Sequence, residues 1–237
     1  MNTVYENVMR VREQIEQAAR AAGRDPAEIT LCAATKVQSD DTIREAIAAG
    51  ITVCGENRVQ EMTAHLQANA YEGAQVHFIG HLQRNKVKYV IGHADLIQSV
   101  DGEELLDMID KQAAKLGIVQ DILIEVNIGG EESKSGVAPE QADLLARRAA
   151  GLEHVRLRGL MAIPPVSQKP GGNREFFAGM RQLYVDINAK KYDNKNTMDI
   201  LSMGMSGDFA DAILEGATLV RVGTALFGAR PANRANG

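Results

Sequence analysis

Apolar residues at helical spacing open the sequence. They lie three or four positions apart, at Val4, Val8, Val11, Ile15 and Ala18 or Ala19. Gly23 ends the run, and polar or charged residues fill most of the positions between. This pattern predicts an amphipathic helix within residues 1–23 that packs one face against the rest of the protein.

The remainder of the chain alternates between short apolar runs and amphipathic stretches. Eight runs are typical of buried strands: Thr30–Thr35, Thr52–Glu56, Gln75–Gly80, Leu96–Val100, Asp121–Ile128, Val155–Ile163, Ile200–Met205 and Leu219–Phe227. Helix-like stretches between them include Asp41–Ala49, Arg58–Ala68, Gly102–Lys115, Pro139–Ala150, Asn173–Ala189 and Asp208–Leu214. The third connection, around residues 82–92, is short.

Strands that alternate with helices predict a parallel sheet covered by right-handed crossovers. The run "DILIEVNI" is largely apolar, which is typical of a strand buried on both faces. Eight units without a "GxGxxG" turn favour an α/β fold of the closed (β/α)8 TIM type, with an extra N-terminal helix, over an open sheet. We therefore expect one domain over residues 1–237, with a polar tail at 229–237.

Composition narrows the classes of partner. The net charge of −5 and the 4% aromatic content argue against nucleic-acid binding. Charge throughout the first 23 residues predicts neither a signal peptide nor a membrane anchor. Cys32 and Cys54 lie in strand-like runs, which suits buried thiols in a reducing cytoplasm.

Polar residues gather where the predicted strands end. In such barrels the functional groups lie at the carboxyl ends of the strands, and phosphate often binds beyond strands seven and eight. Lys36 follows the first strand, Ser206 follows the seventh, and Gly223 and Thr224 lie in the eighth. Hydroxyls and backbone N–H groups in such turns are natural anion ligands. We therefore expect an anion cradle close to a lysine amine.

A lysine amine beside a phosphate cradle indicates pyridoxal 5′-phosphate (PLP), whose aldehyde forms a Schiff base with a deprotonated lysine. Arg221 is a candidate partner for the ring nitrogen of that cofactor. A guanidinium would keep this nitrogen unprotonated and make the ring a weaker electron sink. The plainer alternatives are that Lys36 points into water and that Arg221 pairs with a carboxylate.

Several motifs resemble those of the pyridoxal phosphate homeostasis protein family. They occur in the family's order as "ATKVQ", "GENRVQE", "HFIGHLQRNK", "SKSG", "GLMAI", "LSMGMSGD" and "VRVGTALFG". The likeness extends from the opening helix to Gly228. Members of the family are similar to the barrel half of alanine racemase and bind PLP without known catalysis.

The resemblance implies a role for each candidate site residue. Lys36 matches the Schiff-base lysine and Arg221 the partner of the ring nitrogen, while Asn57 would lie near the ring. Ser206, Gly223 and Thr224 would hold the phosphate. One departure follows the lysine, where Val37, Gln38 and Ser39 replace the family's usual threonine or tyrosine, second basic residue and proline.

The leading hypothesis is a PLP carrier without catalysis that releases the cofactor to apo-enzymes, as a cytoplasmic monomer. The first alternative is a PLP-dependent enzyme similar to an amino-acid racemase. A racemase of this type uses a second domain that supplies a tyrosine base, whereas no tyrosine follows Tyr192 here and Lys36 is the one evident base. The second alternative is a Schiff-base aldolase without PLP, whose cradle holds a sugar phosphate.

Two further features have plain interpretations. His77 and His81 are four positions apart, but "VHFIGH" is typical of a strand and turn, so we expect no metal site. Lys134 lies in a polar loop, where we expect a solvated side chain in preference to a second cofactor contact.

Overall fold

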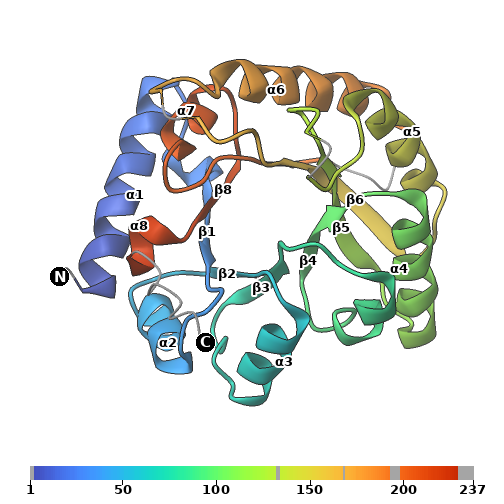
Figure 1. The fold of residues 1–237 in the computed structure, drawn as a ribbon, viewed down its shortest axis with the longest axis horizontal. Helices are drawn as coiled ribbons and strands as arrows, with labels where there is room; N and C mark the ends of the chain where they lie inside the picture. Colours follow the sequence, from blue (N-terminus) through green and yellow to red (C-terminus); the bar gives the residue numbers. More distant parts are fainter. Residues whose placement is uncertain (1–2, 132–133, 168, 193–197, 229–237) are drawn as a thin grey trace, which may run out of the picture.

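The computed structural model describes residues 3–131, 134–167, 169–192 and 198–228. Within them, eight parallel strands form a closed barrel in chain order: β1 (Thr30–Ala34), β2 (Val53–Glu56), β3 (Gln75–Phe78), β4 (Leu96–Val100), β5 (Gln120–Val126), β6 (Val155–Ala162), β7 (Ile200–Ser202) and β8 (Leu219–Val222). This confirms the predicted (β/α)8 fold, and Figure 1 shows the helices arranged around the strands.

The helices of the described residues follow the predicted order, except for the last one, which lies within the predicted strand Leu219–Phe227. They are α1 (Val4–Ala21), α2 (Asp40–Ala48), α3 (Val59–Gln67), α4 (Glu103–Leu116), α5 (Pro139–Ala150), α6 (Arg174–Ala189), α7 (Phe209–Leu214) and α8 (Thr224–Phe227). Two 3-10 helices, η1 (Pro26–Glu28) and η2 (Arg84–Tyr89), complete the set, and η2 forms the short third connection. None of these helices combines the length and apolar character needed to cross a membrane.

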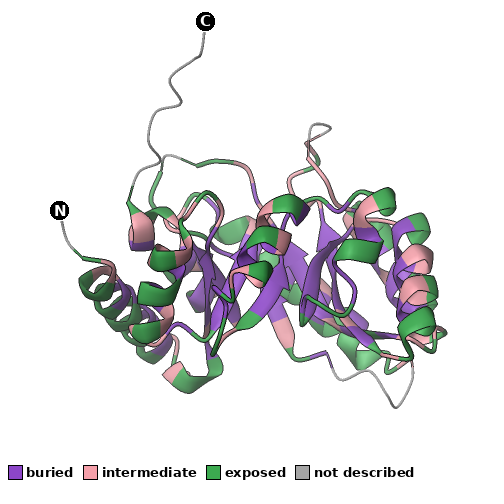
Figure 2. Cartoon of the chain, turned by 90° about the horizontal axis from the view of Figure 1, so that it is seen from below, coloured by how far each residue is buried: buried purple, intermediate pink, exposed green. Residues whose placement is uncertain are grey.

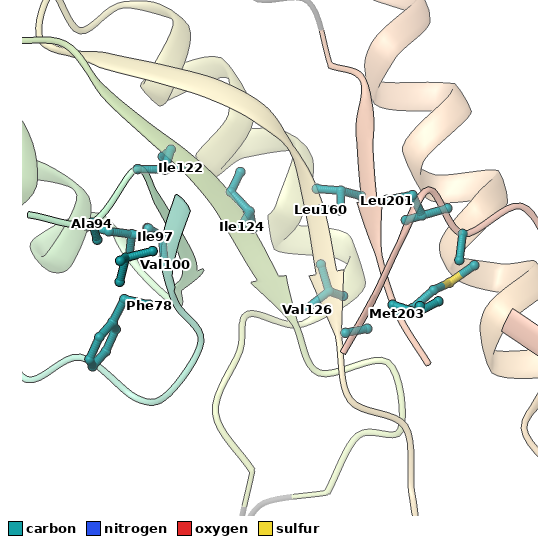
Figure 3. Close-up of a cluster of buried hydrophobic side chains, with 14 of the residues drawn as sticks. Phe78, Ala94, Ile97, Val100, Ile122, Ile124, Val126, Leu160, Leu201 and Met203 are labelled. Atoms are coloured by element: carbon teal, nitrogen blue, oxygen red, sulfur yellow. The ribbon is translucent and has the colours of Figure 1, made fainter. Parts of the chain in front are cut away.

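The main core lies between the barrel and the helices. Alternate strand residues point outward into this layer, and Figure 3 shows part of it, including Ile124 on β5, Leu160 on β6 and Leu201 on β7. Helix α1 adds the buried face that its apolar spacing predicts, with Val8 and Val11 fully buried. Figure 2 shows the same division, with buried strands at the centre and exposed outer helix faces. Burial of this layer is the main source of stability.

The barrel interior has a mixed character. Small apolar clusters fill part of it, one made by Cys32, Val53 and Leu219 and another by Leu96, Leu123 and Met161. Polar side chains occupy the rest, among them His77, Gln98, Glu125, Ser202 and Arg221, all of which are buried. Interiors of this fold are dominated by branched apolar side chains. Buried polar groups in this interior therefore require hydrogen-bond partners.

Two predicted strands, the seventh and the eighth, end three or more residues earlier than expected. The run Ile200–Met205 leaves the sheet after Ser202 because Gly204 turns the chain with a φ of +89°, and a Cβ at that position would lie 2.5 Å from the Cβ of Ala212. The prediction of a strand over Leu219–Phe227 is wrong beyond Val222. The chain turns at Gly223 and forms the single helical turn α8, whose residues carry the same apolar character as a strand.

Candidate functional site at the barrel mouth

A cavity of about 280 Å³ opens at the barrel mouth, which we define as the carboxyl ends of the strands. Five of the six predicted site residues line it: Lys36, Ser206, Arg221, Gly223 and Thr224. The sequence predictions did not include the other lining residues, which are Ala34, Val37, Gln38, Met205, Gly207, Phe227 and Gly228. We call this space the mouth cavity.

Lys36 is half-buried in a tight turn after β1. The next residue, Val37, has a φ of +59°, which is unfavourable for a β-branched side chain. Its N–H donates to Oε2 of Glu61 at 3.0 Å, and the N–H of Gln38 donates to the carbonyl of Thr35 at 3.0 Å. These bonds hold the turn that aims Lys36. Glu61 is the last residue of the motif "GENRVQE", but the sequence analysis gave it no role at the site.

Ser206 joins the two turns that border the cavity. Its Oγ accepts hydrogen bonds from the N–H groups of Gly223 and Ala225, both at 3.2 Å. The hydroxyl proton of Ser206 therefore remains available to an acceptor on the cavity side. The structure records no acceptor for the N–H of Thr224 among the described residues. These donors can bind an anion.

Arg221 lies beneath the cavity and is 4% exposed. Its Nη1 donates to Oγ of Ser202, and its Nη2 donates to the carbonyl of Ala162 at 2.9 Å. No ion pair joins it to a carboxylate of the described residues, so the plain pairing that we considered is not observed. Burial lowers the pKa of Arg221, while the nearby Cys32, Glu125 and Asp208 oppose this effect.

Glu125 is a buried carboxyl that the sequence analysis missed. It alternates with outward-facing residues of β5, so it points into the barrel, and it is 7% exposed. Burial raises its pKa to about 7, Asp101 adds to this rise, and Arg221 opposes it. A charged residue within the apolar run "DILIEVNI" was the available signal.

Asn57 does not line the mouth cavity. It follows β2, whose register pairs Gly55 with Ala34, so Asn57 and Lys36 each lie two residues beyond this pair. Its Oδ1 is buried without a hydrogen-bond partner among the described residues. The backbone of Asn57 approaches Gly80 so closely that a Cβ there would lie 2.2 Å from the Asn57 carbonyl oxygen.

The two histidines of "VHFIGH" face different surroundings. His77 points into the barrel and bonds Gln98, whereas His81 is exposed and lies 3.2 Å from Asp101. Among the described residues, no cluster of His, Cys, Asp or Glu has the arrangement of a metal site. Lys134 differs from the prediction of a solvated side chain, because its Nζ donates to the carbonyl of Pro164 at 3.0 Å and pairs with Glu131.

A larger cavity of about 730 Å³ lies at the barrel base, the amino ends of the strands. Four of the charged residues that line it bond one another. Arg156 donates from Nε and Nη2 to the carboxylate of Asp121 at 2.6 and 2.7 Å. Arg158 donates from Nη1 to Asp121 and from Nε and Nη2 to Asp199, at 2.6 to 2.8 Å. We call this space the base cavity and these four residues the base ion network.

A parallel eight-stranded barrel with a lysine after its first strand and hydroxyl-bearing turns after its last two defines a barrel of the alanine racemase type. Residues 7–231 match the family described as alanine racemase, N-terminal domain. The chain belongs to the pyridoxal phosphate homeostasis protein family. It is 45% identical over 225 residues to the pyridoxal phosphate homeostasis protein of Aquifex aeolicus, covering 95% of this chain and 97% of that protein. The protein of the same name from Escherichia coli K12 is 41% identical over 244 residues, covering 97% and 98%.

Solved structures show the same fold. PipY of Synechococcus elongatus with PLP bound is 32% identical, with a TM-score of 0.77 over 91% of this chain and 100% of PipY. An alanine racemase from Clostridium difficile is 15% identical, with a TM-score of 0.72 over 96% of this chain and 58% of the racemase. The second likeness concerns the fold alone. The predicted family and fold are therefore confirmed.

Proposed function

We propose that this chain binds PLP in the mouth cavity and holds it without converting it, as a carrier in PLP homeostasis. The observation that carries the proposal is that Lys36, Arg221 and Ser206 border one cavity. The relatives support it, since they are named pyridoxal phosphate homeostasis proteins and the PipY structure contains PLP.

The chemistry of the mouth cavity fits the cofactor. Its volume of about 280 Å³ is close to the lower end of the range for small-molecule sites. Ser206, Gly223 and Thr224 offer hydroxyl and N–H donors for a phosphate. Asn57 does not line this cavity, so its expected place near the ring stays a prediction.

Bound PLP supplies an aldehyde for covalent attachment and a ring that stabilises negative charge. In this proposal Nζ of Lys36 adds to the aldehyde carbon, a C=N bond replaces the C=O bond, and water leaves. Arg221 faces the ring nitrogen and keeps it unprotonated, because a guanidinium only donates hydrogen bonds. That arrangement weakens the ring as an electron sink and favours holding the cofactor over using it.

The mouth cavity also favours a carrier over a racemase-like enzyme. Among the described residues that line it, Lys36 alone carries a side chain that serves as a general base, since Arg221 keeps its proton. Racemisation needs proton transfer on both faces of the ring. We further propose a cytoplasmic monomer that passes PLP to apo-enzymes; the buried free thiols Cys32 and Cys54 are consistent with a reducing compartment.

Borohydride trapping tests the attachment. Wild-type protein mixed with PLP and reduced with borohydride should carry a covalent adduct, detected by mass spectrometry. Lys36→Ala should abolish the adduct and retain the circular dichroism of the wild type. Lys111→Ala, which removes an exposed lysine on α4, is the matched control and should keep the adduct. A wild-type level of adduct in Lys36→Ala would contradict the assignment.

Deuterium exchange separates the carrier from the enzyme. The PLP-loaded protein is incubated with L- and D-amino acids in heavy water, and exchange at Cα is followed by mass spectrometry. The proposal expects no exchange above that of free PLP. Rapid exchange that Lys36→Ala abolishes would instead support the racemase-like alternative.

A further inference from the structure

A chain of four buried side chains crosses the barrel interior from the mouth cavity to the base cavity. Nη1 of Arg221 donates to Oγ of Ser202, and Oγ of Ser202 donates to Oε1 of Gln98 at 2.6 Å. Nε2 of Gln98 lies 2.9 Å from Nδ1 of His77. Arg221 lines the mouth cavity and His77 lines the base cavity. We call Arg221, Ser202, Gln98 and His77 the interior hydrogen-bond chain.

The strand order requires the interior hydrogen-bond chain to pass through the barrel interior. Gln98 lies on β4 and Ser202 on β7, and these strands are not neighbours in the barrel. The bond between them therefore passes through the space enclosed by the strands. Gln98 and Ser202 are fully buried, and His77 and Arg221 are each 4% exposed. Buried polar groups of this kind need every partner they have.

The donor at one end dictates the proton position at the other. A guanidinium cannot accept a hydrogen bond, so Ser202 accepts from Arg221 and has its single proton left for Gln98. Gln98 must therefore present its carbonyl oxygen to Ser202 and its NH₂ group to His77. Nδ1 of His77 then has to accept, which places the proton of a neutral ring on Nε2. Only one orientation of each group satisfies all three bonds.

We infer that Ser202, Gln98 and His77 are positioning residues for Arg221, which hold its guanidinium in one orientation beneath the mouth cavity. The role toward the cofactor rests on the proposed PLP-binding function. Ser202 and the carbonyl of Ala162 anchor Nη1 and Nη2, so the remaining guanidinium donors are directed by these two bonds. Neutral His77 keeps Gln98 from turning its amide, and Gln98 in turn fixes the hydroxyl of Ser202.

The first experiment examines the interior hydrogen-bond chain in the cofactor-free protein. Nitrogen-15 NMR of the histidine rings should show Nδ1 of His77 as the unprotonated nitrogen in the wild type. Gln98→Glu replaces the NH₂ donor by an acceptor, so Nδ1 of His77 should become protonated. Gln60→Glu makes the same change on the exposed face of α3 and should leave His77 unaltered. A wild-type His77 with its proton on Nδ1 would overturn the inference.

The second experiment tests whether the interior hydrogen-bond chain affects the contact between Arg221 and the ring nitrogen of PLP. PLP is compared with its carbocyclic analogue, in which a CH group replaces that nitrogen. Ser202→Ala should weaken PLP binding about three- to tenfold and change analogue binding less than twofold. Ser99→Ala removes another fully buried hydroxyl, which has no hydrogen-bond partner among the described residues, and should change neither.

The two proposals fail in different ways. Equal losses of PLP and analogue binding in Ser202→Ala, or no loss of either, would overturn the positioning role alone. A wild-type protein that binds no PLP would overturn the proposed function and the positioning role with it. Selective loss of PLP binding, with Nδ1 of His77 unprotonated in the wild type, would establish the inference.

Discussion

The base cavity has a volume of about 730 Å³ and the mouth cavity about 280 Å³, yet the two differ more in bonding than in size. In the base ion network, Asp121 accepts three hydrogen bonds from two arginines, and Asp199 accepts two. At the mouth, Ser206 and Thr224 keep donors that no described residue accepts. The four residues of the base ion network satisfy one another, whereas the donors of Ser206 and Thr224 at the mouth have no acceptor among the described residues.

This difference separates a structural device from a binding site. The base ion network joins β5 and β6 to Asp199, which directly precedes β7, and the hydrogen bonds of Arg158 with Asp199 and Asp121 raise the pKa of Arg158. Donors without acceptors at the mouth are costly to keep unless a ligand completes them. Ligand sites are thus better recognised by unsatisfied, converging groups than by volume.

The largest expected effect is on the pH dependence of stability. The ionisation of Glu125 and that of His77 change the free energy of unfolding in opposite directions. Burial raises the pKa of Glu125 from 4.5 to about 7, so the folded state holds a proton that the unfolded chain has lost. Stability therefore falls as the pH rises from 4.5 to 7. Burial, with a contribution from Arg158, lowers the pKa of His77 from 6.5 to about 4. Stability therefore falls as the pH drops from 6.5 to 4, and the two effects oppose each other across their shared range.

Glu125→Gln removes the contribution of Glu125 to the pH dependence of stability. The free energy of unfolding of the variant should match the wild type near pH 4 and exceed it by about 3 kcal/mol at pH 8. Urea denaturation from pH 4 to 8 measures the difference. Glu72→Gln, at an exposed position after α3, serves as the control and should show no such rise. A Glu125→Gln curve parallel to the wild type would show that Glu125 ionises normally in the fold.

Asp121→Asn tests the base ion network without changing a residue of the mouth cavity. The amide keeps the shape of the side chain but loses the charge and one acceptor, so Arg156 and Arg158 lose hydrogen bonds to a carboxylate. We expect a loss of about 2 kcal/mol in the free energy of unfolding and less than a twofold change in PLP affinity. Asp199→Asn should lose less than 1 kcal/mol, because the Asp199 side chain is more exposed and among the described residues it bonds Arg158 alone. A large loss of PLP affinity in Asp121→Asn would contradict the division between the two ends.

The sequence was most informative where local pattern determines structure. Alternating strands and helices imply a parallel barrel, and a parallel barrel brings all strand ends to one face, so Lys36, Ser206 and Arg221 could be placed together before any contact was known. The extent of β8 could not be derived in this way. The apolar run through Phe227 suits a strand and a single helical turn equally well, and only the turn at Gly223 separates them.

The pattern of apolar and polar residues could not predict contacts between elements that are distant in the sequence. Gln98 and Ser202 are 104 positions apart, and their bond depends on the register of strands that do not touch in the sheet. The spacing of His77 and His81 raised the question of a metal pair, whereas the structure bonds His77 to the side-chain amide of Gln98 on β4. Glu61 supports the Lys36 turn from α3, which periodicity alone does not reveal.

The smallest expected effect concerns Val37, which lies at the mouth beside Lys36. Its φ of +59° costs about 1–2 kcal/mol for a residue with a Cβ, and its side chain is 56% exposed, so little packing offsets that cost. Val37→Gly removes the strain but adds about 0.5–1 kcal/mol of backbone entropy to the unfolded state. The free energy of unfolding should therefore rise by about 0.5 kcal/mol.

Val119→Gly is the matched control for this substitution. Val119 is 55% exposed at the opposite end of the barrel and does not have a positive φ, so glycine there should destabilise the protein by about 0.5–1 kcal/mol. Because the glycine turn is less ordered, Val37→Gly should also weaken PLP binding about twofold, whereas Val119→Gly should not. Urea denaturation and PLP titration measure both effects. Equal destabilisation by the two substitutions would show that Val37 carries no strain; a gain in stability with weaker PLP binding would show that the turn trades stability for the orientation of Lys36.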